Sequence, residues 1–499
     1  MSSHPNQTDS RVRLPAVLAI GFTGHRRLPD EEQSRKLIRG FLEQQLAAGQ
    51  GVVFGVCSVA AGGDLLFAEN CLELSIPLRV LLPMPQERFR DDFDAATWAR
   101  AERVLADAIA VEVVSHHEGH EGYYECGIET VQQSQLLVTL WDGKKARGMG
   151  GTAEIVAFAT KVGRPVVRFD SETGAKEIFN EEAMGDLLRD AELDFLNGLP
   201  DAGVVMPEQK GEALARAWFK KVDANASLFA PRSRKLASVP VLYTAAAALF
   251  SGIATRNPDA ILWLAISAGM GVVAALLPAI LRLDAWQARW ARTRTAAEVC
   301  RSTIALWNTP ATYDLIGPES IPNLAGVLRS LRYLRMQDTA GKAFSLEEFR
   351  HEYREQRLEG QIRYFADKSQ QAAREGRWFR AVAWVSGGMA LAITLWWFAS
   401  RLAGFAVHRH FAGRWIPLAI SALFQIATVT GALVVIRDCD RRHHRYRELQ
   451  EWLQNWSPLF DALNTWGLVL QVAKRVERAL LVELLEWRSL MRHAKLPRK

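Results

Sequence analysis

Cysteine is scarce in this chain, and none of the cysteines is spaced for a metal site or a redox motif. The 499 residues include only five cysteines, an odd number without a C-x-x-C pair. Such a set excludes a disulfide-stapled secreted scaffold, and it favours reduced thiols in a cytosolic compartment. We therefore expect no metal site.

Two common phosphate-binding fingerprints are also missing. The chain contains neither G-x-x-x-x-G-K-[ST] nor G-x-G-x-x-G. These absences exclude a P-loop and a conventional dinucleotide-binding motif. A secretory signal is not expected either, because the first sixteen residues are polar and lack a long apolar run.

Formally charged residues are absent from four long stretches in the second half of the chain. Each stretch contains 20 or 22 residues, and about 20 helical residues cross a hydrocarbon core roughly 30 Å thick. The stretches are residues 236–255, 260–281, 381–400 and 415–436. We therefore predict four membrane-spanning helices, arranged as two hairpins.

The two halves of the chain carry opposite charge, which predicts their orientation. Residues 1–230 contain 24 Lys and Arg against 34 Asp and Glu, whereas residues 231–499 contain 37 against 21. The second half also holds 13 of the 16 tryptophans. In both predicted hairpins, arginines gather just before the first span and just after the second. This pattern is typical of a multi-pass protein of the cell membrane with cytoplasmic N- and C-termini.

The basic segment 437–447 raises the question of a nucleic-acid partner. Its place directly after the last predicted span favours contact with the lipid bilayer. We therefore expect no nucleic-acid partner.

The first half alternates short apolar runs with segments long enough for crossover helices. The runs are residues 17–22, 52–56, 78–82, 109–114, 136–141 and 165–169. Their order predicts an α/β domain of the doubly wound, Rossmann-like class with a mostly parallel sheet, followed by an α-helical membrane domain. Ligands of such sheets bind beyond the carboxyl ends of the strands.

Glycine-rich segments follow three of these predicted strands. The candidate ligand-binding residues are Gly21, Thr23, Gly24, His25 and Arg26 after the first run; Gly62, Gly63 and Asp64 after the second; and Trp141, Asp142, Gly150, Gly151, Thr152 and Glu154 after the fifth. Glycines let a backbone approach a phosphate closely, and helix N-termini present free N–H donors. The pattern favours a nucleotide-like ligand, with ordinary strand-to-helix turns as the alternative.

At these residues the chain resembles a known superfamily. Similar motifs occur in SLOG domains; here they are Gly21-x-Thr-Gly-His-Arg26, Gly62-Gly-Asp64, Leu82-Pro-x-Pro85 with Asp92-Phe93, and Trp141-Asp-Gly143 with Gly150-Gly-Thr-Ala-Glu154. That superfamily includes LOG nucleotide phosphoribohydrolases, DprA-like proteins and nucleotide sensors. The second half, with Arg294-x-x-Ala-Glu298, resembles the SLATT transmembrane effectors that accompany SLOG sensors in bacterial defence.

The resemblance implies a function that joins the two halves. A cytosolic SLOG-like domain would sense a nucleotide-derived second messenger, such as an ADP-ribose derivative or a cyclic nucleotide, and would need no other cofactor. Binding would trigger membrane permeabilisation or pore formation in antiphage defence. Because no predicted span contains a charged residue, any pore requires assembly, and we expect a homo-oligomer.

Two alternative functions remain open. A membrane-tethered nucleotide phosphoribohydrolase would use Glu154 as its general acid or base and Arg26 as its phosphate anchor. The LOG motif Gly-Gly-x-Gly-Thr-x-x-Glu is not matched, because Thr152 is followed by Ala-Glu-Ile. This departure favours binding over catalysis. The third possibility is a non-catalytic membrane scaffold.

These patterns also predict the domain boundaries. We expect a polar tail (1–14), a SLOG-like nucleotide-binding domain (15–175), a helical connector (176–235), a first transmembrane hairpin (236–281), a cytosolic helical region (282–380), a second hairpin (381–436) and basic C-terminal helices (437–499).

Overall fold

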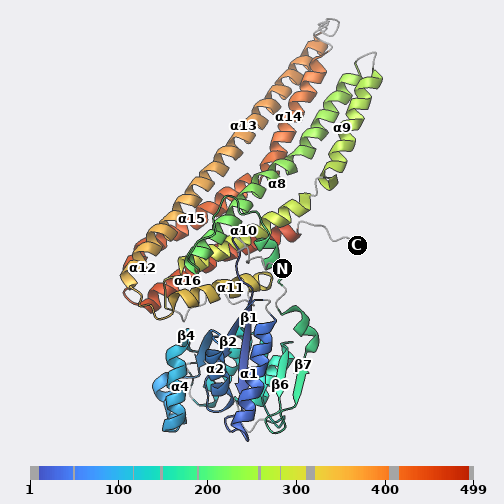
Figure 1. Cartoon of the computed structure of the whole chain (residues 1–499). Coiled ribbons are helices and arrows are strands. Elements are labelled where there is room, and N and C mark those ends of the chain that lie inside the picture. The colour runs from blue at the N-terminus through green and yellow to red at the C-terminus, as the bar shows by residue number, and fades with distance from the viewer. Residues whose placement is uncertain are drawn as a thin grey trace, which may run out of the picture. The chain divides into compact units, whose positions relative to one another are not determined.

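The chain divides into two compact units. The computed structural model describes residues 11–48, 51–115, 117, 119–145, 150–187, 190–256, 260–280, 283–310, 321–403 and 415–493. The first unit consists of residues 1–222 and 296–344, and the second of residues 223–295 and 345–499. The first unit contains the sheet, and the second contains the longest helices (Figure 1).

A seven-stranded sheet forms the centre of the first unit. The strands are β1 (Val17–Gly24), β2 (Val52–Cys57), β3 (Leu78–Leu82), β4 (Ala110–Val113), β5 (Leu136–Leu140), β6 (Val166–Phe169) and β7 (Lys176–Phe179). Their spatial order is β4-β3-β2-β1-β5-β6-β7, and only the β6–β7 pair is antiparallel. The predicted parallel α/β sheet is therefore confirmed, and β7 is an addition that the sequence analysis missed.

Helices and short helical turns connect the strands or follow the sheet. They are α1 (Glu31–Ala47), α2 (Gly63–Glu73), α3 (Gln86–Phe89), η1 (Arg90–Asp92), α4 (Ala95–Asp107), α5 (His120–Gln133), α6 (Thr152–Lys161), η2 (Glu181–Asp186) and α7 (Ala191–Asn197). α1 and α4 begin at Asp30 and Asp94, whose side chains accept a hydrogen bond from Gln33 N and Thr97 N respectively. Such aspartates satisfy amides that lack a partner in the first helical turn.

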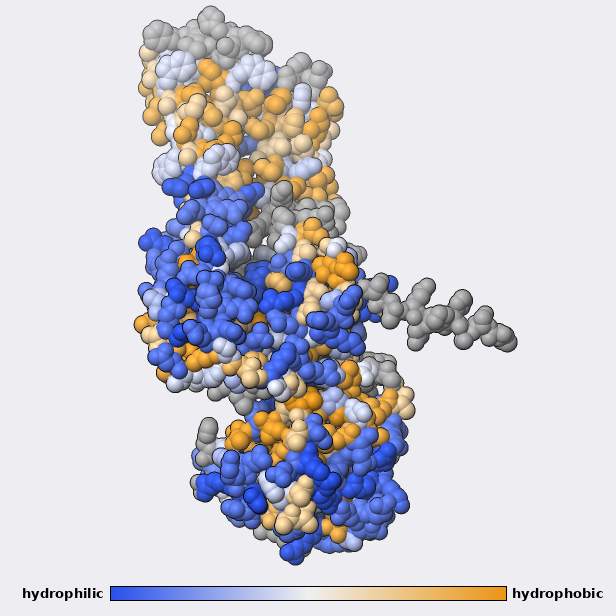
Figure 2. Space-filling view, turned by 60° about the vertical axis from the view of Figure 1, so that its left-hand side comes forward, coloured by the Kyte–Doolittle hydropathy of each residue, from blue (hydrophilic) through white to orange (hydrophobic). Residues whose placement is uncertain are grey.

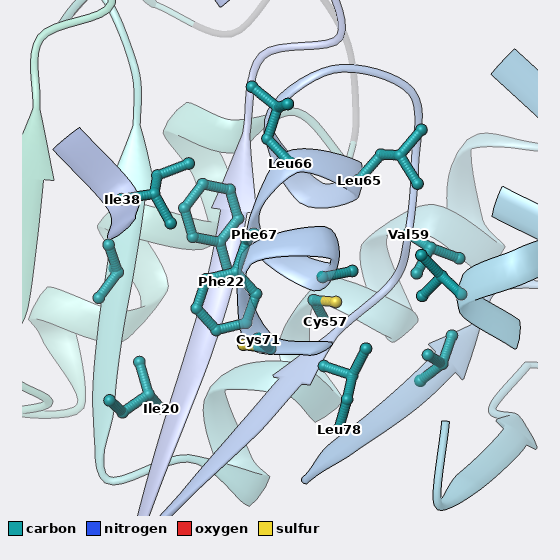
Figure 3. Close-up of a cluster of buried hydrophobic side chains, with 14 of the residues drawn as sticks. Ile20, Phe22, Ile38, Cys57, Val59, Leu65, Leu66, Phe67, Cys71 and Leu78 are labelled. Atoms are coloured by element: carbon teal, nitrogen blue, oxygen red, sulfur yellow. The ribbon is translucent and has the colours of Figure 1, made fainter. Parts of the chain in front are cut away.

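Alternating side chains of the strands form two cores, one on each face of the sheet. In β5, Leu136, Val138 and Leu140 belong to a core with α1, α2 and α4, whereas Leu137 belongs to a core with α5 and α6. This follows from the two-residue period of a strand. In the larger core Phe22 and Phe67 stack with ring centroids 4.8 Å apart (Figure 3). The sheet is therefore covered by helices on both faces.

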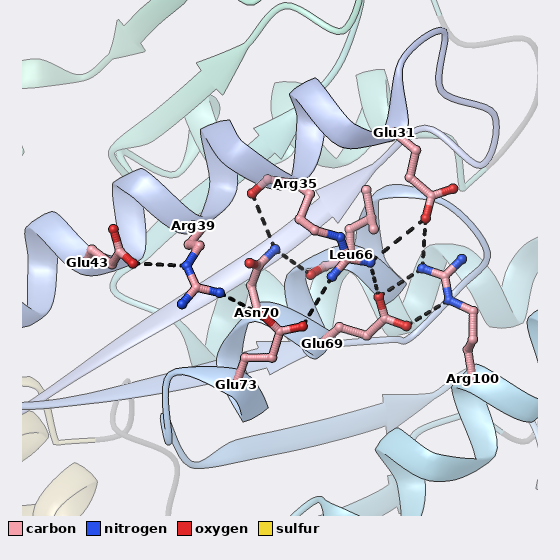
Figure 4. Close-up of polar contacts among 9 residues, drawn as sticks. All are labelled: Glu31, Arg35, Arg39, Glu43, Leu66, Glu69, Asn70, Glu73 and Arg100. Atoms are coloured by element: carbon pink, nitrogen blue, oxygen red, sulfur yellow. Dashed lines mark hydrogen bonds and ion pairs between the residues drawn. The ribbon is translucent and has the colours of Figure 1, made fainter.

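Ion pairs join the three helices of the larger layer on their outer side. Glu69 of α2 accepts hydrogen bonds from Arg35 of α1 (2.6 Å) and from Arg100 of α4 (2.7 Å) (Figure 4). Burial acts to raise the pKa of Glu69, but the two guanidinium groups outweigh it and hold this pKa below its usual range. These ion pairs therefore join α1, α2 and α4 to one another.

The remaining elements are mostly long helices. They are α8 (Glu212–Ala254), α9 (Ala260–Ile280), α10 (Leu283–Ala305), η4 (Pro322–Leu324), α11 (Ala325–Thr339), α12 (Leu346–Glu352), the π-helical segment η5 (Tyr353–Leu358), α13 (Glu359–Leu402), α14 (Ile416–Ile436), α15 (Cys439–Asp461) and α16 (Trp466–His493). α13 packs against α14 and α15 (Figure 1). α11 belongs to the first unit, where Tyr333 packs edge-on against Phe54 of β2.

The prediction of four membrane-spanning helices is wrong for the described residues. Two helices are long and apolar enough to cross a membrane, Leu346–Leu402 and Ile416–Asp461. In the first predicted hairpin, the apolar helices within the described residues are shorter, Ser238–Ala254 and Ile261–Leu277. The prediction counted uncharged residues, whereas the two helices that meet the criterion combine sufficient length with an apolar window. The predicted end at residue 281 lies outside the described residues.

The two long apolar helices leave large side chains uncovered within the described chain. The exposed fractions of Trp384 and Val435 are 80% and 78%, and those of Phe398 and Leu395 are 61% and 59%. Figure 2 shows hydrophobic surface gathered at one end of the helical region and hydrophilic surface directly next to it. A core helix of a soluble protein buries such side chains instead.

Candidate functional site

A cavity of about 850 Å³ lies at the carboxyl edge of the parallel sheet. β1 pairs with β2 on one side and with β5 on the other, so the strand order reverses there. Most of the predicted site residues line this cavity: Thr23, Gly24, His25, Arg26, Asp64, Trp141, Asp142, Gly150, Gly151 and Thr152. The structure thus brings the loops after β1 and β5 together at the point where doubly wound sheets bind ligands.

Four predicted residues do not line the cavity. Gly21 lies within β1, Gly62 is the N-cap of α2, and Gly63 and Glu154 lie in the first turns of α2 and α6. The contacts described below show that three of these four residues support the backbone of the site.

His25 and Asp142 connect the loops that follow β1 and β5. The amide of His25 donates to the carbonyl oxygen of Leu140 (3.0 Å), and His25 Nε2 lies 3.0 Å from Asp142 Oδ1. Desolvation acts to raise the pKa of Asp142, but hydrogen bonds from the Lys144 amide and from His25 lower it to about 2. Asp142 is therefore a charged residue of the cavity wall.

Arg26 lies against the wall that α5 provides. Its guanidinium carbon is 4.7 Å from the ring centre of Tyr123, and its Nη2 is 3.4 Å from Asp92 Oδ2. The hydroxyl of Tyr123 donates to the same Asp92 oxygen. The Arg26 side chain is half exposed, so it is positioned at the cavity without being sequestered.

The second glycine loop supports the first loop. Gly62 has φ +88°, and a Cβ atom there would lie 2.4 Å from the carbonyl oxygen of His25. The amide of Gly63 donates to that oxygen (3.0 Å). Only glycine permits both the positive φ and the close approach. The N-terminal amide of α2 is thus used inside the protein.

Asp64 occupies the N-terminal turn of α2 as a buried carboxylate. Its side chain accepts hydrogen bonds from the amide of Gly24 (3.0 Å) and from the hydroxyl of Ser58 (3.0 Å). Burial raises its pKa to about 6, although both hydrogen bonds act in the opposite direction. Asp64 therefore joins the ends of β1 and β2 at the cavity wall.

The N-terminus of α6 offers unused amides to the cavity. Glu154 Oε2 accepts a hydrogen bond from the amide of Gly150 (2.7 Å), which fixes the loop, and Gly151 at the N-cap supplies no side-chain acceptor. The first amides of a helix have no partner within it, and they lie at the positive end of the helix dipole. Thr152 and Ala153 of this turn line the cavity.

Three further cationic side chains of the cavity, those of Arg27, Lys144 and Lys145, were not among the predicted residues. Lys144 pairs with Glu172 (2.7 Å) and with Asp142 (3.3 Å). Arg27 and Lys145 also line the cavity, and neither has an ion-pair partner in the part of the chain that the structure describes. Both follow predicted residues in the same loops, so their positions in the sequence could have indicated them.

The cavity holds no activated nucleophile among its described cysteines, and the described residues form no metal cluster. The Cys126 thiol lines the cavity, but burial raises its pKa well above the usual range, and it donates to the carbonyl oxygen of Leu81. No group of three or more His, Cys, Asp or Glu in the described ranges could hold a metal ion. The buried Cys126 thiol is therefore not the thiolate that a cysteine nucleophile requires.

Comparisons with known proteins do not place this chain in a family. No protein family model matches it, and a search of curated proteins finds no similar sequence.

Proposed function

We propose that this protein is a membrane effector whose α/β domain senses a nucleotide-derived second messenger. The single observation that carries the proposal is the cavity at the reversal of strand order between β1 and β5. Its volume of about 850 Å³ falls in the range of small-molecule sites, roughly 300 to 1,000 Å³. A nucleotide such as an ADP-ribose derivative or a cyclic nucleotide fits that class.

The charge around the cavity supports an anionic ligand. All four acidic residues that line the cavity already have partners. Asp92 and Asp142 are engaged by Tyr123, Arg26 and His25, Glu172 pairs with Lys144, and Asp64 accepts from Gly24 and Ser58. What remains for a ligand are the first amides of α6, together with the side chains of Arg27 and Lys145. Amides of a helix N-terminus and nearby cations are the usual donors to phosphate.

The enzyme alternative receives no support from the position of Glu154. Its carboxylate accepts the Gly150 amide and does not line the cavity. The glutamate therefore stabilises the loop before α6, much as an acidic residue in the first turn caps a helix. We propose binding without turnover.

The membrane part of the proposal rests on α13 and α14. Their apolar side chains, including Trp384, Leu395 and Val435, are more than half exposed in the described chain, and lipid or a second copy of the chain would cover them. Arginines flank these helices at one end. We infer a cell-membrane protein with cytoplasmic termini that permeabilises the bilayer as a homo-oligomer.

The test is a substitution that blocks the α6 amides while preserving the helix. Gly151 has φ −74° and ψ 157° at the N-cap, a conformation that aspartate favours at this position. Gly151→Asp should therefore leave folding intact, but its carboxylate would occupy the site of the ligand anion. Titration of the full chain in detergent with ADP-ribose and with cyclic nucleotides should show binding that this variant weakens on the order of a hundredfold or more.

Two further variants separate charge from other effects. Gly151→Asn adds a side chain of the same size without the charge, and we expect it to weaken binding less than Gly151→Asp. Gly40→Asp adds the same charge on the exposed side of α1, where a Cβ meets no atom within 4 Å, and it should bind as the wild type does. Equal affinity of wild type and Gly151→Asp would remove this cavity as the ligand site.

A further inference from the structure

A second cavity, of about 410 Å³, lies between α13 and α15 in the helical unit. It is lined by Gln370, Ala373, Arg374, Arg377 and Arg380 of α13 and by Asp440 and His443 of α15. The wall is therefore made largely of basic side chains from two packed helices.

Two arginines of this cavity have no partner in the described part of the chain. Arg374 and Arg377 lie about one helical turn apart and are exposed. The neighbouring acids are already used, since Asp440 accepts from Arg380 (2.5 Å) and Glu375 accepts from Arg437 (2.5 Å). The cavity consequently keeps an excess of positive charge.

His443 adds a fixed polar group to the same wall. Its Nδ1 lies 2.9 Å from the hydroxyl of Ser369, which holds the ring in place on α15. The amide side chain of Gln370 lines the opposite helix. A group that accepts several hydrogen bonds at once, such as a phosphate, matches this set of donors.

The position of the arginines along α13 indicates the source of the phosphate. The charge-free stretch begins at Ala381, so Arg377 and Arg374 lie about 6 and 10 Å before it along the helix axis. The headgroup layer extends roughly 5 to 8 Å beyond the hydrocarbon core on each side. Arg377 lies at that depth, and the long side chain of Arg374, one turn further, can extend toward the layer. The adjacent Trp378 is 62% exposed, and exposed tryptophan is typical of a membrane interface.

We propose that this cavity binds the phosphate of an anionic phospholipid headgroup. Arg374 and Arg377 are the principal ligands, because guanidinium groups match phosphate oxygens in pairs of hydrogen bonds. The assignment rests on the membrane part of the proposed function and is independent of the cavity in the sheet domain. A bound lipid at this place would link α13 to α15 next to the charge-free stretch of α13.

The test uses the full chain in nanodiscs of phosphatidylcholine with and without phosphatidylglycerol. Native mass spectrometry should show phosphatidylglycerol retained by the wild type. Arg377→Gln should weaken retention about fivefold and the double variant Arg374→Gln/Arg377→Gln about 25-fold, from the usual contribution of one basic residue near an anionic surface. Arg363→Gln is the matched control, since this exposed arginine of α13 lies about 27 Å from Ala381 and should leave retention unchanged.

Three outcomes would overturn the proposal. The first is equal retention of phosphatidylglycerol by the wild type and the double variant. The second is that inorganic phosphate stabilises the wild type against unfolding as much as phosphatidylglycerol does. The site would then be one for a soluble phosphate. The third is failure of the chain to insert into nanodiscs, which would also remove the membrane part of the proposed function. The double variant is expected to bind ADP-ribose as the wild type does, because its substitutions lie outside the sheet domain. Failure of the wild type to bind ADP-ribose would therefore contradict the nucleotide site and not the phospholipid site.

Discussion

At the scale of single residues, Asp64 has the most consequential environment in the sheet domain. It is 5% exposed, and burial raises its pKa from the ordinary value of 3.8 to about 6. A raised carboxyl pKa means that the folded state favours the protonated form. This contribution to stability is therefore present below about pH 4, and it is lost as the pH rises through 6.

The prediction for Asp64 is a change in the pH dependence of stability. The shift of roughly two pKa units corresponds to about 3 kcal/mol. Asp64→Asn keeps an acceptor for the Gly24 amide and cannot ionise. The stability of this variant should therefore not fall for this reason as the pH rises through 6. Thermal unfolding of the full chain in detergent should show a smaller fall in melting temperature between about pH 4.5 and 7.5 for the variant than for the wild type.

An exposed aspartate provides the control for this measurement. Asp30 is the N-cap of α1 and accepts a hydrogen bond from Gln33 N, and asparagine serves equally well at such a position. Asp30→Asn removes an exposed carboxylate and keeps the helix cap, so it shows how much of any change in melting comes from the substitution itself. An identical pH dependence in Asp64→Asn and wild type would contradict the raised pKa.

At the scale of elements, a buried ion pair joins α16 to η5, the segment directly before α13. Arg357 of η5 donates to both carboxylate oxygens of Glu477 (2.8 and 2.5 Å), and the hydroxyl of Tyr353 donates to the same carboxylate (2.9 Å). Their side chains are 5% and 0% exposed. Removing one member of such a pair leaves a buried charge without its counter-ion.

Glu477→Gln should therefore destabilise the helical unit by about 3 to 5 kcal/mol. Replacing both partners, as in Arg357→Met/Glu477→Leu, should recover most of this loss, because neither variant side chain requires a counter-ion. Hydrogen exchange of the α13 and α16 amides in the full chain measures both effects.

The neighbouring pair of Arg354 and Asp461 is a matched control, because it joins η5 to α15 at 40% and 47% exposure. Asp461→Asn should cost less than about 1 kcal/mol. A loss as large as that of Glu477→Gln would show that burial of the ion pair is not the cause.

The same scale shows which elements the sequence could predict. The strands β1, β2, β3 and β5 are buried along most of their length, and continuous apolar runs are the pattern of a parallel sheet covered on both faces. β7 is four residues long, with its first two residues exposed, so no apolar run marks it. Its pairing with β6 depends on tertiary contacts.

The candidate site shows a similar division. The loops after β1 and β5 could be predicted, because the carboxyl ends of parallel strands lie at one edge of a sheet. The role of Gly62 could not, since the sequence shows a glycine but not the carbonyl oxygen of His25 beside it. Asp92 belongs to a quoted motif, but its place at the cavity was not predicted. Tyr123 reaches the cavity from α5, and such a contact between distant segments leaves no local signal.

At the scale of the whole molecule, the proposed mechanism requires several subunits. Moving a two-state equilibrium from 1:99 to 99:1 takes about 5.5 kcal/mol of differential binding, whereas coupling at a single site usually supplies roughly 1 to 3 kcal/mol. The exposed apolar side chains of α13 and α14 provide a surface on which copies of the chain could associate within a bilayer.

Mixed assemblies test this requirement. Vesicles that contain wild-type chain and Gly151→Asp chain in known ratios should release dye on addition of ADP-ribose less than in proportion to the wild-type fraction. The expected dose response of the wild type is steep, with a Hill coefficient above one. Release that falls linearly with the wild-type fraction would show that each subunit acts alone.

The discontinuous first unit has a consequence for synthesis of the protein. Its last segment, residues 296–344 with α11, is separated from the sheet by residues 223–295. A ribosome adding about 5 to 20 residues per second needs roughly 4 to 15 s to make that interval. During this time Phe54 lacks its contact with Tyr333, and the backbone carbonyl of Pro15 lacks its hydrogen bond from Ser330. The surface of the nascent sheet domain that α11 covers is therefore exposed at first. This surface is covered only after residues 223–295 have been synthesised.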